Sequence, residues 1–490
     1  MNYISKENYI VLYWDLPEIF KVGDKFEIFE AGKKIGETEK CHYRAENLES
    51  GKEYEFEVSG VGKIKAETSL PKEKVDVTKA PYNAVGDGKT LNTEALQKAI
   101  DDCRENQMVY IPEGDFMTGS LFLHSNMELF LDKGAIIHGT VEVKDYSPKI
   151  KSRFEGIEMM CYAGLLNIGE LDREKGFTCE NVKISGFGEV RGGGRDLYQN
   201  VIDIEMVLMK DEMEALGDKI KECETSWTIP GRVRPRLINV SCAKNVEITG
   251  IKIAYGPSWN VHMIYSDNVV TYDCTFESKG VHNGDGWDPD SSENCTLFGC
   301  EFYTGDDSVA IKSGKNPEGN VINRPSRHIR VFDCISHMGH GITIGSEMSG
   351  GIEDVKIWNC DVNNSMFGIE IKGTKKRGGY VRNVSVRNCS VGRLIFHSVG
   401  YNDDGIGAPT PPEFSDCTFE DITISAVQQE KDGSLTPCEA IEVAGFDEPG
   451  YEVKNVKFKN IYLDNGNSTQ RQTMYLQCCK GVTFENICAK

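Results

Sequence analysis

Six segments in the middle of this 490-residue chain repeat one short pattern, and this repeat limits the possible folds more than any other feature. The segments are NVEITGIKI, NVVTYDCTF, NCTLFGCEF, HIRVFDCIS, DVKIWNCDV and NVSVRNCSV, which begin at Asn245, Asn268, Asn294, His328, Asp354 and Asn383. Each alternates apolar and polar residues over a few positions, as a short strand does. Repeats of roughly 20–50 residues are typical of solenoids and propellers.

The last five segments carry a cysteine at the same position. It lies six residues after the first residue, which gives the set Cys274, Cys300, Cys334, Cys360 and Cys389. The intervals between them are 26, 34, 26 and 29 residues. One coil of this length cannot bury its own apolar face, whereas stacked coils share one core. We therefore predict an all-β fold, a right-handed parallel β-helix, with these cysteines stacked as small buried side chains.

The chain has 17 cysteines in all. A zinc site needs close pairs such as CxxC, and the adjacent Cys478 and Cys479 have the wrong spacing for one. We expect reduced, buried thiols and no metal.

The first seventy or so residues have a different pattern. The strands YIVLYWDL, KFEIFEAG, KKIGETEK and YEFEVSGVGKIKAET alternate in polarity and are separated by Gly, Asn and Asp, as in a small β-sandwich. Trp14, Tyr43, Leu48 and the YEFEV strand resemble a fibronectin type III module. The stretch SLPKEKV around Pro71 is the predicted linker.

This pattern divides the chain into a β-sandwich over residues 1–72 and a β-helix domain over residues 73–490. Two helical segments are predicted within the second domain. One runs from Asn92 to about Cys103 with an apolar face, and the other is an insertion near residues 203–224.

The formal net charge of −21 argues against binding to nucleic acid or to an anionic membrane. No run of 18 or more apolar residues is present, so a membrane span is not expected. The start of the chain lacks a basic segment followed by an apolar one, which predicts a cytoplasmic protein, or a secreted one if a leader was removed. Residues 371–400 contain seven Lys and Arg and no acid, so an anionic substrate remains possible.

Two acidic turns carry the candidate chemistry. HNGDGWDPDSS contains Asp285, and TGDDSVAIKSG places Asp306 and Asp307 side by side. Asp285 and Asp306 are 21 residues apart, about one coil, so the two turns are predicted to stack. The next coils supply His340 in SHMGHGITIGS and Lys372 in MFGIEIKGTKKRGGY. We interpret this constellation as an active site.

Crowded carboxyls suit acid-catalysed hydrolysis of a glycosidic bond. One carboxyl must be protonated to donate to the leaving oxygen, and another must be ionised to activate water. Mutual repulsion raises the pKa of at least one while the others stay charged. The alternative is that Asp-rich turns cap backbone amides or bind calcium, which is common for an isolated pair.

Residues 75–490 resemble the polygalacturonases, family 28 of the glycoside hydrolases. AVGDGKTLNTEALQKAIDDC, VYIPEGDFMTGSLFL, RPRLINVSCAKNVEITGIKI and GPSWNVH are similar to segments of that family. Its Asn-Thr-Asp, Gly-Asp-Asp and Gly-His-Gly motifs correspond to Asn283-Gly284-Asp285, Gly305-Asp306-Asp307 and Gly339-His340-Gly341.

The resemblance implies a role for each of these residues. Asp306 is the general acid, and Asp285 and Asp307 activate the attacking water, with inversion at the anomeric carbon. His340 maintains ionisation or contacts the sugar at the cleavage point, and Asn283 belongs to the substrate-binding set. The family needs no metal and no organic cofactor.

One motif departs from the family. Its Arg-Ile-Lys, which holds a galacturonate carboxylate, corresponds to Glu370-Ile371-Lys372. Glutamate in place of arginine would repel a uronate, so a neutral sugar such as rhamnose on the leaving side is one interpretation. The other is that Arg377 compensates for the missing arginine.

The insertion GKNPEGNVINRPSRH and the N-terminal module resemble exo-acting bacterial members, in which loops close one end of the groove. Lys312 would then contact a terminal carboxylate. The predicted partner is a galacturonate-containing oligosaccharide. The alternatives are a hydrolase of rhamnogalacturonan-type linkages, a β-helix pectate lyase or a non-catalytic carbohydrate-binding protein; the oligomeric state stays open.

Overall fold

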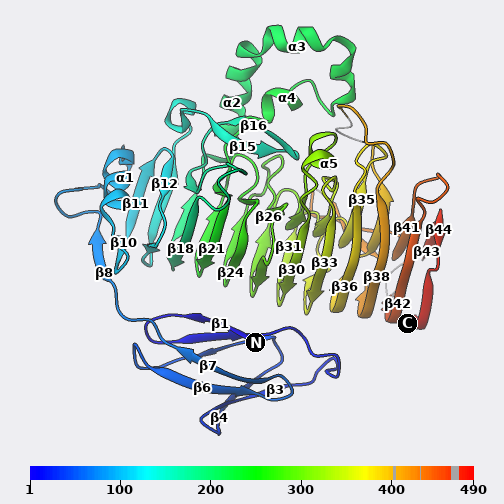
Figure 1. The fold of residues 1–490 in the computed structure, drawn as a ribbon, viewed down its shortest axis with the longest axis horizontal. Helices are drawn as coiled ribbons and strands as arrows, with labels where there is room; N and C mark the ends of the chain where they lie inside the picture. The colour runs from blue at the N-terminus through cyan, green and yellow to red at the C-terminus, as the bar shows by residue number, and fades with distance from the viewer. Residues whose placement is uncertain (401–403, 431, 465–473, 490) are drawn as a thin grey trace.

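The computed structural model describes residues 1–400, 404–430, 432–464 and 474–489. Figure 1 shows a long row of stacked coils with a small unit of strands along one side and helices along the other. Among the described residues, none of the helices combines the length and the apolar character that crossing a membrane requires.

The small unit is built from two antiparallel sheets. One has the order β1(Asn2–Ser5), β2(Ile10–Tyr13), β5(His42–Ala45). The other has the order β4(Lys33–Thr38), β3(Phe26–Glu30), β6(Glu53–Val58), β7(Gly62–Glu67). Trp14, Phe26 and Phe56 fill the core of the unit. The likeness to a fibronectin type III module stays a prediction.

The coils form the predicted right-handed parallel β-helix, whose strands lie in three parallel faces. The first face contains β8(Glu73–Asp76), β10(Gln107–Ile111), β13(Met127–Leu131), β18(Cys179–Gly186), β21(Ala243–Thr249), β24(Asp267–Tyr272), β27(Thr296–Phe298), β30(Ser326–Phe332), β33(Ile352–Trp358), β36(Tyr380–Val391), β38(Glu413–Ile424), β42(Val453–Leu463), β44(Cys479–Lys480) and β45(Thr483–Ala489). The second contains β9(Asp87–Leu91), β11(Gly114–Thr118), β14(Ala135–Gly139), β19(Glu189–Arg191), β22(Lys252–Ala254), β25(Thr275–Glu277), β28(Glu301–Tyr303), β31(Ile335–Met338) and β34(Asp361–Val362).

The third face carries the candidate site. Its order is β12(Leu121–Leu123), β17(Leu166–Ile168), β20(Ile238–Ser241), β23(Val261–Ile264), β26(Trp287–Asp290), β29(Val309–Ile311), β32(Ile342–Ile344), β35(Ile369–Gly373), β37(Leu394–Ser398), β41(Ile441–Ala444) and β43(Met474–Gln477). Each strand therefore pairs with strands from the coils before and after it.

The first residue of each repeat turns a corner of the coil. Asn245, Asn268, Asn294, His328, Asp354 and Asn383 all have left-handed backbone, with φ between 50° and 57°. Asparagine tolerates this conformation better than most residues because its short side chain forms local hydrogen bonds. The side chains also stack: Asn268 donates to Asn245 at 2.8 Å, and Asn245 donates to Asn181 at 2.9 Å. This corner explains why the repeats begin with Asn, Asp or His.

The cysteine ladder is present as predicted. Cys274, Cys300, Cys334, Cys360 and Cys389 are all buried in the core of the β-helix, and none is in a disulfide. Their small side chains leave room for the backbone to turn between two faces.

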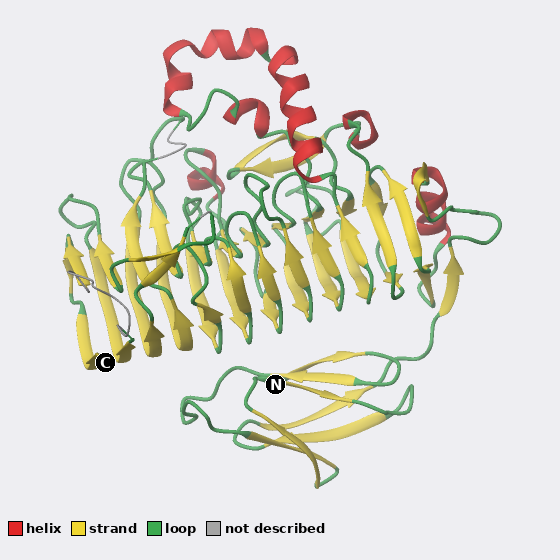
Figure 2. Cartoon of the chain, turned by 180° about the vertical axis from the view of Figure 1, so that it is seen from behind, coloured by secondary structure: helices red, strands yellow, loops and turns green. Residues whose placement is uncertain are grey.

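Helices and hairpins interrupt the coils. The helices are α1(Thr93–Asp102), α2(Gly194–Leu208), α3(Lys210–Leu216), α4(Thr228–Gly231) and α5(Glu318–Ile322), with 3₁₀ turns η1(Val143–Tyr146) and η2(Gly217–Glu222). The hairpins are β15(Ile150–Phe154) with β16(Ile157–Cys161), and β39(Val427–Gln429) with β40(Leu435–Pro437). The predicted helix at 92–103 is confirmed, whereas the helical insertion begins earlier than predicted, at Gly194. Figures 1 and 2 show β15–β16 and α2–α4 together on the side of the β-helix away from the N-terminal unit.

The N-terminal unit packs on an aromatic stack on the outside of the β-helix. Tyr272, Phe298, Phe332 and Trp358 stack from coil to coil with ring centroids 4.6, 4.9 and 4.4 Å apart. Tyr13 of the unit stacks on Phe298 at 4.8 Å, and the four rings belong to the unit's own hydrophobic core. The two parts therefore share a buried interface on the face opposite the insertions.

Candidate active site

The predicted residues lie on or just before four consecutive strands of the third face. Asp285 immediately precedes β26, Asp306 and Asp307 precede β29, His340 precedes β32, and Lys372 is on β35. Trp287 pairs with Val309, Val309 with Ile342, and Ile342 with Ile369, so neighbouring coils are in register. Adjacent strands in a sheet are about 4.8 Å apart, which brings side chains from successive coils into contact.

His340 joins the two adjacent aspartates. Its Nδ1 lies 3.0 Å from Oδ1 of Asp306 and 3.4 Å from Oδ1 of Asp307. Burial alone would lower the pKa of His340, but the two carboxylates raise it to about 10. Burial alone would raise the pKa of Asp306, but the His340 imidazolium lowers it below its usual range. The pair therefore shares one proton, which lies on His340 in the free protein.

Asp306 is also the most accessible acid of the three. Its side chain is 21% exposed, compared with 5% for Asp307 and 3% for Asp285. A glycosidic oxygen entering the groove can therefore reach Asp306 more easily than either neighbour.

Lys312 lies on the other side of the acids, where it is almost completely buried. Its Nζ is 3.4 Å from Asp285, 3.9 Å from Asp288 and 3.5 Å from Glu347. It also lies over the ring of Trp259, 4.6 Å from the centroid. Burial would lower its pKa, but the surrounding carboxylates raise it well above the usual value. We expected Lys312 to contact a terminal sugar carboxylate. In the structure it contacts carboxyl groups of the protein instead.

Lys372 and Glu370 form a second buried charge cluster. Lys372 Nζ is 3.0 Å from Glu370 and 3.8 Å from Asp307. Glu370 also accepts a hydrogen bond from Nε2 of His397, and Thr343 donates to Asp307 at 2.8 Å. Burial alone would raise the pKa of Glu370, but Lys372 and His397 lower it to about 2.

Glu370 is only 1% exposed, so it does not face a sugar as the sequence suggested. Its charge is balanced inside the protein by Lys372 and by the hydrogen bond from His397, whose side chain is 22% exposed. The repulsion of a uronate that we expected from Glu370 is therefore largely cancelled.

Arg377 does not replace the missing family arginine. It is fully buried, and its guanidinium donates to the carbonyl of Ser346 and to Oδ1 of Asn316 at 2.8 Å. A side chain with no exposed surface cannot contact a substrate, so we correct this expectation. Asn283 lies beside Asp285, and its Oδ1 accepts a 2.7 Å hydrogen bond from Arg234.

Three groups of the site were not predicted: Asp288, Glu347 and His397. Asp288 alternates with Asp290 along one strand, which could have indicated it. His397 pairs in register with Lys372 on the next coil, so extending the repeat by one coil would also have found it. Glu347 follows the irregular segment after β32 and has no such signal.

Among the residues that the structure describes, Asp306, Asp307 and His340 offer potential metal-ligand atoms within 4.8 Å of one another. With a pKa of about 10, however, His340 keeps its proton at neutral pH. A protonated imidazole cannot ligate a metal. The group therefore fits a proton-sharing pair better than a cation site.

A wall of insertions lies beside the coil that carries Asp285, where Arg153 of β15 pairs with Asp290 of β26. The β15–β16 turn, the loop around Lys315 and the segment after α4 meet in an ionic cluster. In it, Arg232 lies 2.7 Å from Glu155 and 2.8 Å from Asp404, and Lys315 lies 2.5 Å from Asp404. Arg232 and Lys315 are buried, which makes these contacts less sensitive to salt than surface pairs.

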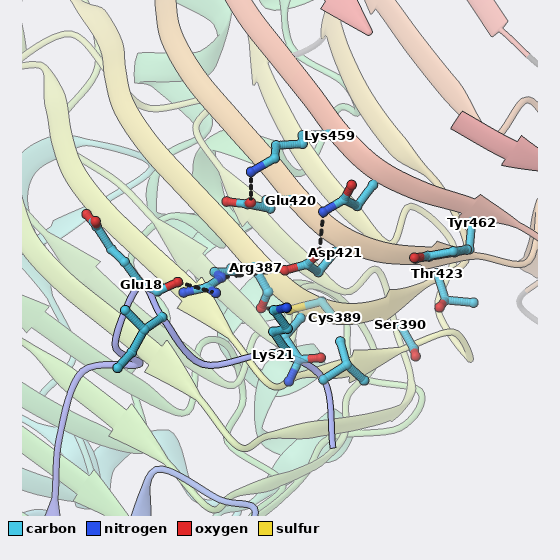
Figure 3. A pocket seen from close by; sticks show the side chains of 14 residues that line it. Glu18, Lys21, Arg387, Cys389, Ser390, Glu420, Asp421, Thr423, Lys459 and Tyr462 are labelled. Carbon is cyan, nitrogen blue, oxygen red and sulfur yellow. Dashed lines mark hydrogen bonds and ion pairs between the residues drawn. The ribbon is translucent and has the colours of Figure 1, made fainter. Parts of the chain in front are cut away.

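A separate cavity of about 670 Å³ lies between the N-terminal unit and β36, β38 and β42 (Figure 3). Arg387 donates there to the carbonyl oxygens of Pro17 and Glu18, and Lys459 pairs with Glu420 at 2.5 Å. None of the predicted site residues lines it. We regard it as part of the contact between the two parts of the chain.

The region that carries the catalytic acids matches a known protein family. Residues 171–470, which contain Asp285, Asp306 and Asp307, match the glycosyl hydrolases family 28. The chain belongs to this family. Residues 77–136 match a second family, described as rhamnogalacturonase A/epimerase, pectate lyase-like.

The family 28 chain is similar along its whole length to known proteins. It is 25% identical to an exo-poly-alpha-D-galacturonosidase of Dickeya chrysanthemi, over 98% of this chain and 88% of the relative. The structure of a family 28 exopolygalacturonase from Yersinia enterocolitica superposes with a TM-score of 0.80 at 23% identity, covering 99% and 97% of the two chains. An exopolygalacturonase from Thermotoga maritima superposes with a TM-score of 0.67 at 26% identity, covering 86% and 93%.

Membership of family 28 makes the protein a glycoside hydrolase. The lyase and the non-catalytic binding protein that the sequence left open are therefore not favoured.

Proposed function

We propose that this family 28 hydrolase releases galacturonate from the end of pectin-derived oligosaccharides, with inversion at the anomeric carbon. The observation that carries the proposal is the His340–Asp306 pair next to Asp285 and Asp307, which provides a proton donor beside two acceptors. The Dickeya and Thermotoga proteins, named as exo-acting on galacturonides, support the choice of substrate and of exo action.

The wall of insertions supports exo action. It contacts the coils that carry Asp285 and Asp306: Arg153 of β15 pairs with Asp290, and Gly156 accepts a hydrogen bond from Lys315. Lys372 and His397 lie two and three coils further on, on the leaving-sugar side implied by the family motif. Contacts of the insertions with the coils of Asp285 and Asp306 are what we expect if only one sugar fits beyond the cleaved bond.

Asp306 acts as the general acid. When a sugar covers the site and excludes water, the proton moves from Nδ1 of His340 to Oδ1 of Asp306 across 3.0 Å. Asp306 then donates it to the glycosidic oxygen as the bond from that oxygen to C1 breaks. The leaving sugar departs with a neutral hydroxyl group.

A water molecule attacks C1 from the opposite side of the ring and loses a proton to Asp285 or Asp307. Inverting enzymes place acid and base about 6.5–9.5 Å apart to admit this water. Asp285 lies one coil from Asp306. The water oxygen forms the new bond to C1, and an α-linked substrate yields a β-anomer first.

The neutral-sugar alternative is not favoured. It depended on an unbalanced negative charge at Glu370, which Lys372 and His397 neutralise.

The test uses α-1,4-linked tri- and tetragalacturonate and, in parallel, rhamnogalacturonan fragments with a terminal galacturonate. Products are followed by mass spectrometry and the first anomer by NMR. We expect monomeric galacturonate from the first turnovers, as the β-anomer, from the galacturonate oligomers. Early dimers or trimers would refute exo action, and release from the rhamnogalacturonan fragments alone would refute the substrate.

A further inference from the structure

Strand β26, with the sequence WDPD, buries two aspartates that have different surroundings. Trp287 belongs to the core of the β-helix, so Asp288 and Asp290 alternate with it onto the groove side. Both are completely buried under the insertions. A buried ionised carboxylate is costly unless it is paired, so each of them needs a partner or a proton.

Asp290 has partners that keep it ionised. Arg153 donates to it at 2.9 Å, the amide of Gly314 at 3.1 Å, and His262 lies 3.3 Å away. Burial alone would raise its pKa, but Arg153 and His262 lower it below the usual value. Asp290 is therefore a structural anion.

Asp288 has no comparable partner. Within the part of the chain that the structure describes, neither of its carboxyl oxygens accepts a hydrogen bond, and its contact with Lys312 is long, at 3.9 Å. Its neighbour is the carboxyl group of Asp285, since Nζ of Lys312 lies 3.4 Å from Asp285 and 3.9 Å from Asp288. Oδ1 of Asp285 likewise has no donor. Two acceptors that face each other without a donor are stable only if one carries a proton.

The charges around Asp288 point the same way. The carboxyl groups of Asp285 and Asp307 and the cations Lys312 and Arg236 surround Asp288, and burial together with Asp306 raises the pKa of Asp285 above its usual range as well. Burial raises the pKa of Asp288 well above its usual range, and Asp285 adds to the rise. Lys312 is closer to Asp285, at 3.4 Å, so the negative charge of the pair is better placed on Asp285.

We propose that Asp288 is an uncharged positioning residue whose carboxylic O–H donates a hydrogen bond to Asp285 and so holds Asp285 ionised toward the attacking water. This inference rests on the proposed hydrolysis at the same site. Asp288 itself does not touch the substrate, because its side chain has no exposed surface.

The substitutions Asp288→Asn and Asp288→Ala separate this role from others. An asparagine amide keeps a donor toward Asp285 but cannot ionise, whereas alanine removes the donor. We expect Asp288→Asn to keep kcat within about threefold and Asp288→Ala to lose about ten- to a hundredfold, with KM changed by less than about threefold in both. The activity of Asp288→Asn should also persist to higher pH than that of the native protein, because Asp288 no longer loses its proton.

Stability supplies a measurement that does not need activity, with Asp290→Asn as the matched control. Asp288→Asn should retain the native melting temperature at neutral pH, whereas Asp290→Asn should lower it because Arg153 loses its partner. A raised pKa means that folded Asp288 holds a proton that the unfolded chain releases, so its contribution to stability falls as pH rises above about 4. The melting temperature of Asp288→Asn should therefore depend less on pH between 5 and 8.

Equal losses of activity in Asp288→Asn and Asp288→Ala, or equal losses of stability in Asp288→Asn and Asp290→Asn, would overturn the proposal, since Asp288 would then be needed as an anion. If Asp288→Ala does not fold, the pH profiles of Asp288→Asn decide. Absence of hydrolysis by the native protein would refute the proposed function alone, because the melting curves still test the proton on Asp288.

Discussion

Replacing Glu370 with glutamine tests whether this residue faces the substrate or holds the site together from within. The carboxylate is buried and has a pKa of about 2, compared with an ordinary value of 4.5, because Lys372 and His397 stabilise its charged form. One pKa unit corresponds to about 1.36 kcal/mol, so the shift implies about 3 kcal/mol of interaction with the charged form. This stabilisation is present above pH 4.5 and is lost as pH falls toward 2.

Glu370→Gln keeps the shape of the side chain and removes the charge. At neutral pH we expect it to lose up to about 3 kcal/mol of unfolding free energy, which is about 3 °C in melting temperature, because unfolding entropy for a chain of this size is about 1 kcal/mol per degree. Lys372 and His397 would then present their charge to the groove, and KM for trigalacturonate should fall or stay constant while its dependence on salt increases.

The assays are melting curves at pH 4, 5 and 7 and Michaelis–Menten kinetics at two salt concentrations. Glu413→Gln, at an exposed position on β38, is the control and should change stability by less than about 0.5 kcal/mol. An unchanged melting temperature together with a large fall in KM would refute our reasoning, since Glu370 would then repel the substrate directly.

Four further outcomes are expected. Asp306→Asn should lower kcat about 10²–10⁴-fold while calorimetry still detects binding of trigalacturonate; unchanged turnover would remove Asp306 as the acid. In melting experiments His340→Asn should be less stable than the native protein at neutral pH. This difference in stability should be fully present below pH 6.5 and should vanish as pH rises through about 10. Lys312→Met should cost about 3–5 kcal/mol in denaturant unfolding and abolish turnover, because three buried carboxyl groups lose their shared cation. Deletion of residues 1–72 should expose the aromatic stack and cause aggregation in light scattering; a monomeric deletion variant would contradict this.

The fold could be predicted from the sequence because each coil repeats the same local requirements. A left-handed corner favours residues such as Asn245, and a narrow turn of the core favours cysteine, so both recur in phase. Asp285, Asp306 and His340 could be placed together for the same reason, since positions one coil apart are neighbours. The repeat specifies the backbone of a coil and the neighbours of each position on it.

What the repeat does not specify is which side chains become covered. Glu370 and Arg377 were expected to meet the sugar, but Arg377 is held by Ser346 and Asn316 of irregular segments, and Glu370 pairs with Lys372 and His397 on neighbouring strands. Lys312 directly follows strand β29, and its partner Glu347 comes from an irregular loop. In each case the charge of the side chain predicted a contact with substrate. In the structure the side chain is buried and pairs with charged or polar groups of the protein instead.

The aromatic interface between the N-terminal unit and the β-helix also constrains the order in which the chain folds. Coils of a solenoid can form one after another from neighbouring contacts, with short loops to close. Tyr13, however, packs on Phe298, and Pro17 accepts a hydrogen bond from Arg387, so the first residues can dock only after coils 285 to 370 positions later have been synthesised. During synthesis at about 5–20 residues per second, the unit's docking surface stays uncovered for tens of seconds. Slow synthesis through residues 270–390 should therefore lower the yield of soluble protein more than slow synthesis after them.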